Sequence, residues 1–295
     1  MNALVLRFRR YWFSDVSDGW HYAVFRVLWS QFHFTFAIYM FYWNYKEMQL
    51  PPLQYPGVLS VFSQLSVEAV LGMAVAHFVL AICILAGWHT RFMQCAAFVS
   101  AVPLLFHSVS LYQNHYVFYL LVTLYATLMP AERFYSVDAS RMKQKLSAAA
   151  YRAWKSAPVP VYPQRLIMLQ LSFLYFFAGL NKLDPVWFAR WSATPELASL
   201  ATDPVVAAFW MQLVHTGVAW IPIAAVALGM LSLSVGIMYA NKYPLIALVA
   251  IGMHLSFQFM LPIMEFTSMC MSILFLSLFP LRNRVTEELV AVMRR

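Results

Sequence analysis

A lysine next to a long apolar stretch is the first residue of this sequence that could do chemistry. Lys182 directly follows the run 175–181, and Asp184 and Pro185 come shortly after it. An ionisable group at membrane depth costs about 2.5–3.5 kcal/mol and marks a functional site by default. Desolvation favours the neutral amine, which can act as a general base. Two alternatives are that Lys182 extends to the outer headgroups, or that Asp184 keeps it charged.

A second polar group lies at a turn between two apolar blocks. His107 precedes this turn, and the pair Asn114 and His115 follows it. Asparagine is a residue type that caps helix N-termini, and an imidazole can donate or accept a proton near neutral pH. Capping and hydrogen bonds across a helical bundle are the alternatives to a catalytic role for these residues.

A third group interrupts the apolar stretch that begins at Pro244. His254, Gln258 and Glu265 are separated by offsets of four and 11 residues from the first. On a helix that turns 100° per residue, these offsets place the three side chains within about 40° of one another. A polar stripe on an apolar membrane helix faces the interior of the bundle. We therefore expect either a buried hydrogen-bond network or part of a catalytic pocket.

Metal chemistry is not expected. A site formed by His107, His115 and His254 would lack the tight ligand spacing on one helix that zinc sites use. The sequence also has no Gly-rich phosphate loop, serine-nucleophile elbow or dinucleotide fingerprint. General acid–base chemistry is the reaction type that the polar residues favour.

The elements that must position these residues are membrane helices. Of 295 residues, 62% are hydrophobic and 11% are charged, whereas a soluble domain has about a quarter charged residues. The apolar residues form blocks of about 20, the length of a transmembrane helix. Because lipid cannot hydrogen-bond the backbone, each block must be helical. The predicted fold class is all-α, a polytopic transmembrane helical bundle of about eight spans.

The eight expected spans cover residues 20–45, 67–88, 92–112, 114–129, 163–181, 211–239, 244–264 and 266–281. We expect the sixth to break near Pro222 and the seventh to kink near Pro262. Two loops stand out between the spans. Residues 130–162 are basic and partly helical in pattern, and residues 182–214 are rich in Trp and Pro, which suits the outer membrane interface.

The charge distribution predicts that both termini are cytoplasmic. With the N-terminus inside, 16 of the 20 Lys and Arg residues lie on the inner side, Lys46, Lys182 and Arg190 lie outside, and Arg26 lies within a span. This asymmetry follows the positive-inside rule. The net charge of +8 is thus a topology signal and does not indicate nucleic-acid binding.

The expected organisation has three parts. They are a cytoplasmic segment 1–17, a transmembrane domain 18–281 and a cytoplasmic tail 282–295. We expect a multi-pass protein of a bacterial inner membrane, with membrane lipid as a partner.

Three segments together resemble the horizontally transferred transmembrane (HTTM) domain family, which includes vitamin K-dependent gamma-carboxylase. They are residues 113–116 at the start of a span, residues 175–183, and the late span centred on His254. Their order and rough spacing fit the family over about residues 18–280. The segment that contains Lys182 is the most specific of the three.

The resemblance implies a reaction. In the carboxylase, a lysine in the matching segment deprotonates vitamin K hydroquinone. The quinol then reacts with oxygen to give an alkoxide base that removes a proton from a glutamate side chain, which adds carbon dioxide. Lys182 takes the place of that lysine, Asn114 and His115 match an Asn–His pair near the active site, and His254 matches another histidine. The charge count independently places all four residues towards the outer face.

The expected catalytic set is therefore Lys182, His115, Asn114 and His254, and a reduced quinone is the expected cofactor. Two other functions stay open. One is a non-catalytic membrane protein for export of, or tolerance to, a small peptide or lipid. The other is a proton or solute transporter that uses the polar stripe of the seventh span. His107, Gln258 and Glu265 are expected to be further polar residues of the pocket. The inner halves of the fifth and seventh spans are almost wholly apolar, which argues against a continuous transport path.

Overall fold

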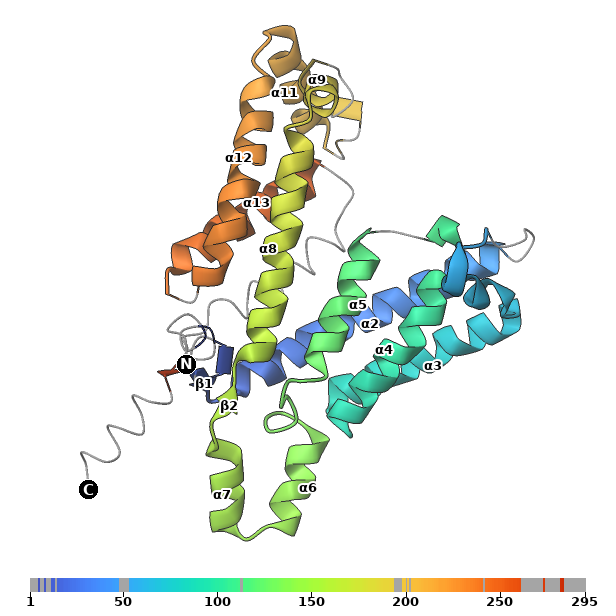
Figure 1. The fold of residues 1–295 in the computed structure, drawn as a ribbon, viewed down its shortest axis with the longest axis vertical. Helices are drawn as coiled ribbons and strands as arrows, with labels where there is room; N and C mark the ends of the chain where they lie inside the picture. Colours follow the sequence, from blue (N-terminus) through green and yellow to red (C-terminus); the bar gives the residue numbers. More distant parts are fainter. Residues whose placement is uncertain are drawn as a thin grey trace. The chain divides into compact units, whose positions relative to one another are not determined.

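The structure is a computed structural model that describes residues 5, 8, 12–13, 15–47, 53–111, 114–193, 198–199, 201, 203–240, 242–260, 273 and 282–283. These residues are mostly helical, which confirms the predicted all-α class (Figure 1). The chain divides into two compact units. The first contains Met1–Gln164 and Leu281–Arg295, and the second contains Arg165–Pro280.

Four helices form the body of the first unit. They are α2 (Trp20–Glu47), α3 (Val67–Ala86), α4 (Thr90–Phe106) and α5 (Asn114–Ala126), and they correspond to the first four predicted spans. α3 begins after Ser66, whose hydroxyl accepts a hydrogen bond from the amide of Ala69 (3.3 Å), and ends before Gly87 in a left-handed conformation (φ 68°). Serine and glycine are residue types preferred at these two helix ends. α4 ends earlier than the predicted limit at residue 112.

Short elements connect these helices. They are the 3₁₀ helices η1 (Gly57–Gln64) and η2 (Val109–Leu111), and the helices α6 (Val137–Lys145) and α7 (Ala148–Ser156). α6 and α7 confirm that the basic loop 130–162 is partly helical. Each follows a serine, Ser136 or Ser147, whose hydroxyl accepts from a first-turn amide, so each has the expected N-cap.

A small antiparallel sheet, which the sequence did not predict, joins distant parts of the first unit. Its strands are β1 (Asp15–Ser17), β2 (Val159–Pro160) and β3 (Arg282–Asn283), in the order β2-β1-β3. Strands this short carry no alternating pattern, so they escape prediction. The N-terminal segment, the loop before α8 and the C-terminal segment therefore meet at one place.

The second unit is built from α8 (Tyr162–Lys182), whose first residues lie in the first unit, and from α9 (Pro185–Ala193), α11 (Pro204–His215), α12 (Trp220–Gly236), η3 (Ile237–Tyr239) and α13 (Pro244–Met260). The predicted sixth span breaks at Gly217 (φ 70°) and not at Pro222. Pro222 lies in the first turn of α12, where a missing N–H costs no helical hydrogen bond. Pro262 and the predicted eighth span, apart from residue 273, lie outside the described residues.

Several described helices are apolar enough for a membrane. Val67–Ala86 and Trp220–Tyr239 could each cross one alone, and Tyr162–Lys182 with Pro185–Ser192 adds a third if this bent pair forms one span. α4, α5, α11 and α13 provide shorter apolar segments. These helices fit a membrane protein. The number of eight spans and the cytoplasmic termini stay predictions.

Candidate functional site

The candidate lysine lies at a sharp joint between two helices. α8 ends at Lys182, and α9 starts at Pro185 with a bend of 77° between the helices. Asp184 Oδ1 accepts hydrogen bonds from the amides of Val186 (3.0 Å) and Trp187 (2.9 Å) at the start of α9. Aspartate at the N-cap and proline in the first turn are the residue types that begin a helix. The sequence Asp184-Pro185 thus explains why the chain turns directly after the lysine.

Lys182 is half-buried at this joint, beneath an aromatic ring. Its Nζ lies 5.0 Å from the centre of the Trp187 ring. In the part of the chain that the structure describes, no carboxylate is within ion-pair distance of Lys182. The nearby Asp184 carboxylate instead caps α9. Whether Asp184 also keeps Lys182 charged stays a prediction.

Close packing of α8 on α12 fixes the direction of the lysine helix. A Cβ atom placed on Gly179 would lie 2.8 Å from Leu231 Cγ and 3.2 Å from the carbonyl oxygen of Ala227. Ser172 also donates a hydrogen bond to the carbonyl of Ser234. α12 runs beside α8 in Figure 1. Only a residue without a side chain fits at position 179 at this separation, which gives the glycine of the lysine segment a structural reason.

His254 is buried and is hydrogen-bonded to a tyrosine of the lysine helix. Its Nε2 lies 2.8 Å from the hydroxyl of Tyr175, which is also buried. Tyr175 and Lys182 are seven residues apart, so they share a face of α8 and are separated by two turns, about 10 Å. The structure therefore places His254 on the same face of α8 as Lys182. A molecule that touches both groups would have to extend about two turns along this helix.

The other two residues of the predicted polar stripe have side chains outside the described part of the chain. Gln258 lies on α13, but its side chain is outside the described residues, and Glu265 is outside them entirely. Of the predicted stripe, the structure thus establishes only that His254 faces the interior of the second unit.

Asn114 and His115 form the first turn of α5, in the first unit. Asn114 is the first residue of α5, as the predicted fourth span has it; its side chain is outside the description, so its capping role stays a prediction. His115 is half-buried, and its ring lies 4.6 Å from the ring of Tyr116. Tyr116 in turn packs on Tyr39 of α2 (4.9 Å). These two predicted catalytic residues thus belong to a different unit from Lys182 and His254.

His107 joins three segments at one end of the first unit. Its Nδ1 lies 2.9 Å from Asn44 Oδ1, and its Nε2 lies 3.3 Å from the carbonyl oxygen of Leu65. The Asn44 amide donates to the carbonyl of Met40, which fixes its oxygen towards His107. The ring therefore ties the end of α4 to α2 and to the segment before α3. This is the structural role that the sequence left as an alternative.

A buried network that the sequence did not assign to a site lies in the core of the first unit. His33, His77, Tyr119 and Ser100 come from α2, α3, α5 and α4, and both histidines are fully buried. Tyr119 Oη contacts His33 Nδ1 and lies 3.0 Å from His77 Nε2, and His77 Nδ1 lies 2.7 Å from Ser100 Oγ. One side chain from each helix thus meets at one point.

The hydrogen bond that Ser100 donates sets the proton positions in this network. Ser100 donates to the carbonyl of Ala97 (3.1 Å), so His77 donates from Nδ1 to Ser100 and accepts at Nε2. Tyr119 then donates to His77 and accepts from His33. Each of these bonds has one donor and one acceptor, as a buried polar network requires. Helical periodicity within one span could flag His33 or His77, but it cannot show that residues of four helices converge.

A cluster of charged residues lies at the start of α4, which is the end of this helix opposite to His107. Asp138 of α6 accepts from the amides of His89 and Thr90 (both 2.9 Å) and caps α4 from another element. The buried guanidinium of Arg26 donates to the carbonyl of Tyr135 (2.5 Å) and lies so close to Gly87 that a Cβ there would overlap it. Arg26 thus joins α2 to the end of α3 and to the loop before α6.

Charged groups of the loop before α6 complete this cluster. Glu132 forms an ion pair with Arg91 (3.5 Å). Burial lowers the pKa of Arg133, and the carboxylate of Glu132 opposes that shift. The guanidinium of Arg133 donates to the carbonyl of Ala157 (2.5 Å), which ties the loop to the end of α7.

In the described part of the chain, no three His, Cys, Asp or Glu side chains form a group that could hold a metal ion. Comparison with known proteins gives one match. A sequence model described as the HTTM domain matches residues 17–280, a range that covers nearly the whole chain and includes Asn114, His115, Lys182 and His254. No curated protein and no solved structure matches the chain. The chain belongs to the HTTM domain family, as the resemblance of its three segments predicted.

Proposed function

We propose that this protein is a multi-pass membrane enzyme that deprotonates a reduced quinone, with Lys182 as the general base on the outer side of a bacterial inner membrane. The observation that carries the proposal is the setting of Lys182. Its amine is half-buried at the α8–α9 joint, under Trp187, and the described residues give it no carboxylate partner. Membership of the HTTM family supports the same residue.

The proton transfer uses the lone pair of the Lys182 amine. Nζ takes the proton of a quinol hydroxyl, so a neutral amine and a neutral quinol become an ammonium and a quinolate anion. The Trp187 ring, 5.0 Å from Nζ, attracts the ammonium through its negative face. This stabilises the charge that forms in the step by about 0.5–2 kcal/mol. Because the amine is partly buried, water screens the attraction between the two new ions less than it would in solution.

His254 and Tyr175 supply a second polar group on the same face of α8. Their hydrogen bond of 2.8 Å holds the Tyr175 hydroxyl in a fixed position. We propose that this pair contacts the second oxygen of the quinol, because the two turns between Tyr175 and Lys182 separate the groups by about 10 Å. Fixed polar groups at both ends of the ring would orient the quinol for proton transfer. The roles that the resemblance gives Asn114 and His115 stay predictions.

The later steps follow from the family. In a carboxylase-like reaction, the quinolate combines with oxygen, and the product is a stronger base that can take a proton from a carbon acid. The apolar quinol would reach the site from the lipid. The composition agrees with this route, because only 11% of the residues are charged, far fewer than in a soluble domain.

Oxygen consumption tests the proposal. The purified protein is supplied with vitamin K hydroquinone and oxygen, and Lys182→Ala is compared with Lys242→Ala. Lys242 is a matched control because its Nζ also lies over an aromatic ring, that of Tyr243 (5.2 Å), but at an exposed turn. Loss of a general base lowers the rate by about 10²–10⁴-fold. We expect this loss in Lys182→Ala and Lys182→Arg, and wild-type rates in Lys242→Ala.

Two results would refute the proposal. One is equal oxygen uptake by Lys182→Ala and Lys242→Ala. The other is no quinol oxidation by the intact protein with any of several reduced quinones. The second result would favour a non-catalytic role in export of, or tolerance to, a small peptide or lipid.

A further inference from the structure

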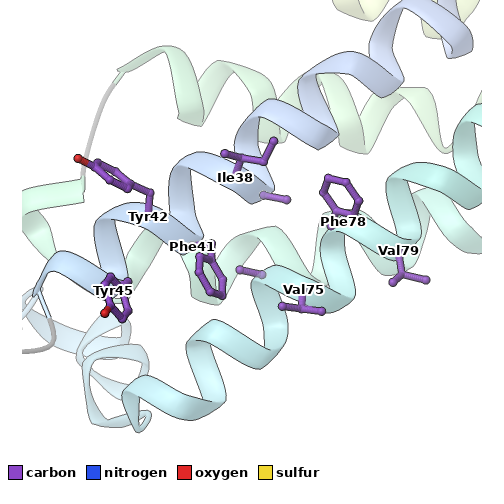
Figure 2. Close-up of a pocket in the computed structure, with 9 residues that line it drawn as sticks. Ile38, Phe41, Tyr42, Tyr45, Val75, Phe78 and Val79 are labelled. Carbon is purple, nitrogen blue, oxygen red and sulfur yellow. The ribbon is translucent and has the colours of Figure 1, made fainter.

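An apolar groove runs between α2 and α3 of the first unit. It has a volume of about 410 Å³ and is lined by Ala37, Ile38, Phe41, Tyr42, Tyr45, Ala74, Val75, Phe78 and Val79. Figure 2 shows Phe41 of α2 and Phe78 of α3 beside the space between the two helices. Every lining residue is apolar or aromatic, so the walls of the groove match a hydrocarbon chain.

The depth of the groove comes from two alanines. Ala37 and Ala74 are 2% and 1% exposed and form its floor, where larger side chains would fill it. Ile38 and Val75 stand beside them and are 59% and 55% exposed. The groove is therefore open along its length to the surroundings of the helices. In a membrane protein, that surrounding is lipid.

A fixed positive charge lies at one end of the groove. The Lys46 ammonium is 4.6 Å from the ring centre of Tyr42 and 5.4 Å from that of Trp43. It directly follows Tyr45, the last residue of α2 in the groove lining. Two aromatic rings restrict the ammonium to this end, and tyrosine and tryptophan are typical of the membrane interface. The charge thus lies where an apolar chain in the groove would meet its headgroup.

We propose that this groove binds one acyl chain of an anionic phospholipid, whose phosphate pairs with Lys46. From Ala37 to Tyr45 the groove extends over eight residue steps, about 12 Å along α2. This is less than one leaflet of the hydrocarbon core, about 15 Å. A single chain therefore lies in one leaflet with its headgroup at the Lys46 end. The proposal concerns the first unit alone and does not depend on the chemistry of Lys182.

Photocrosslinking locates the bound chain. The full-length protein is placed in bilayers that contain phosphatidylglycerol with a diazirine on one acyl chain, and crosslinked peptides are identified by mass spectrometry. We expect crosslinks in residues 37–45 and 74–79. Val75→Trp would fill the groove and remove them. Val99→Trp is the matched control, because Val99 is 66% exposed on α4 and does not line the groove.

Native mass spectrometry measures the headgroup preference. The purified protein is titrated with phosphatidylglycerol or phosphatidylcholine that carry the same acyl chains. We expect phosphatidylglycerol to bind about fivefold more tightly, the contribution of one lysine near an anionic lipid. Lys46→Gln should remove this preference and leave the acyl-chain crosslinks in place.

Three results would overturn the proposal. The first is crosslinking that Val75→Trp and Val99→Trp reduce equally. The second is an unchanged preference for phosphatidylglycerol in Lys46→Gln. The third is displacement of the lipid probe by an isoprenoid quinone or by a second copy of the chain at lower concentration than by phosphatidylglycerol, which would assign the groove to that other occupant.

Discussion

Exchanging a glycine for alanine at two positions of the second unit tests how closely α8 packs on α12. Gly179 lies in α8, and its added Cβ would be 2.8 Å from Leu231 Cγ and 3.2 Å from the backbone oxygen of Ala227. Gly229 lies within α12, and an added Cβ there would meet no atom within 4 Å. The chemical change and the type of secondary structure are the same, so only the contact differs.

The magnitude follows from two opposing terms. Alanine in place of a helical glycine stabilises a protein by roughly 0.5–1 kcal/mol at either position. Forcing a methyl group into a packed contact costs about 1–3 kcal/mol. At position 179, the Leu231 side chain can rotate away in part, but the Ala227 carbonyl belongs to the helix backbone and can move only with α12. We therefore expect Gly229→Ala to be stabilising, and Gly179→Ala to be less stable than Gly229→Ala by about 1–3 kcal/mol.

Thermal unfolding of the two purified variants in the same detergent measures this difference. One kcal/mol corresponds to about 2–4 °C in Tm for a protein of this size class. Gly179→Ala should also reduce quinol oxidation, because a shift of α8 moves Lys182. If both variants had the same Tm, the close approach of α8 and α12 would be wrong, and so would the structural reason given for the glycine of the lysine segment.

Three further predictions concern the first unit. Asp138→Ala removes a charged acceptor from the amides of His89 and Thr90 at the start of α4 and should lower the free energy of unfolding by about 2–4 kcal/mol. Asp203→Ala, which removes an exposed local cap, should cost only about 1 kcal/mol; equal Tm values for the two variants would exclude the long-range cap. His77→Leu breaks the four-helix network and should lower the free energy of unfolding, measured with denaturant, by about 2–4 kcal/mol. Ser100→Ala removes only the end of the network and should cost less; a larger loss of stability in Ser100→Ala would contradict the network. A reporter fused in α6 at Lys143 should read cytoplasmic, and an external signal there would reverse the orientation.

The helices were predictable because each depends on one local property. Blocks of about 20 apolar residues gave the positions of α2, α3 and α8, since lipid requires helical backbone. The break in the sixth span lies at Gly217, a few residues before the predicted position near Pro222. Pro222 fits the first turn of α12, and Gly217 provides the left-handed turn that separates α11 from α12.

The parts of the structure that escaped prediction depend on contacts between distant residues. The strands around Val16 are two or three residues long and exist only because they pair with one another. Convergence of His33 and His77 on Tyr119 requires the register between helices, which no single-helix pattern contains. Lys182 was identified from its own segment, but the capping role of Asp184 needed the geometry of the turn.

The most direct test of the account is whether Lys182 removes a proton from a bound quinol. Oxygen is excluded, the quinol is mixed with purified protein, and the ultraviolet difference spectrum separates the neutral quinol from the quinolate anion. The account predicts quinolate with the wild type and with Lys242→Ala, and neutral bound quinol with Lys182→Ala. A bound quinol that stays neutral in the wild type, or that ionises equally in Lys182→Ala, would contradict it.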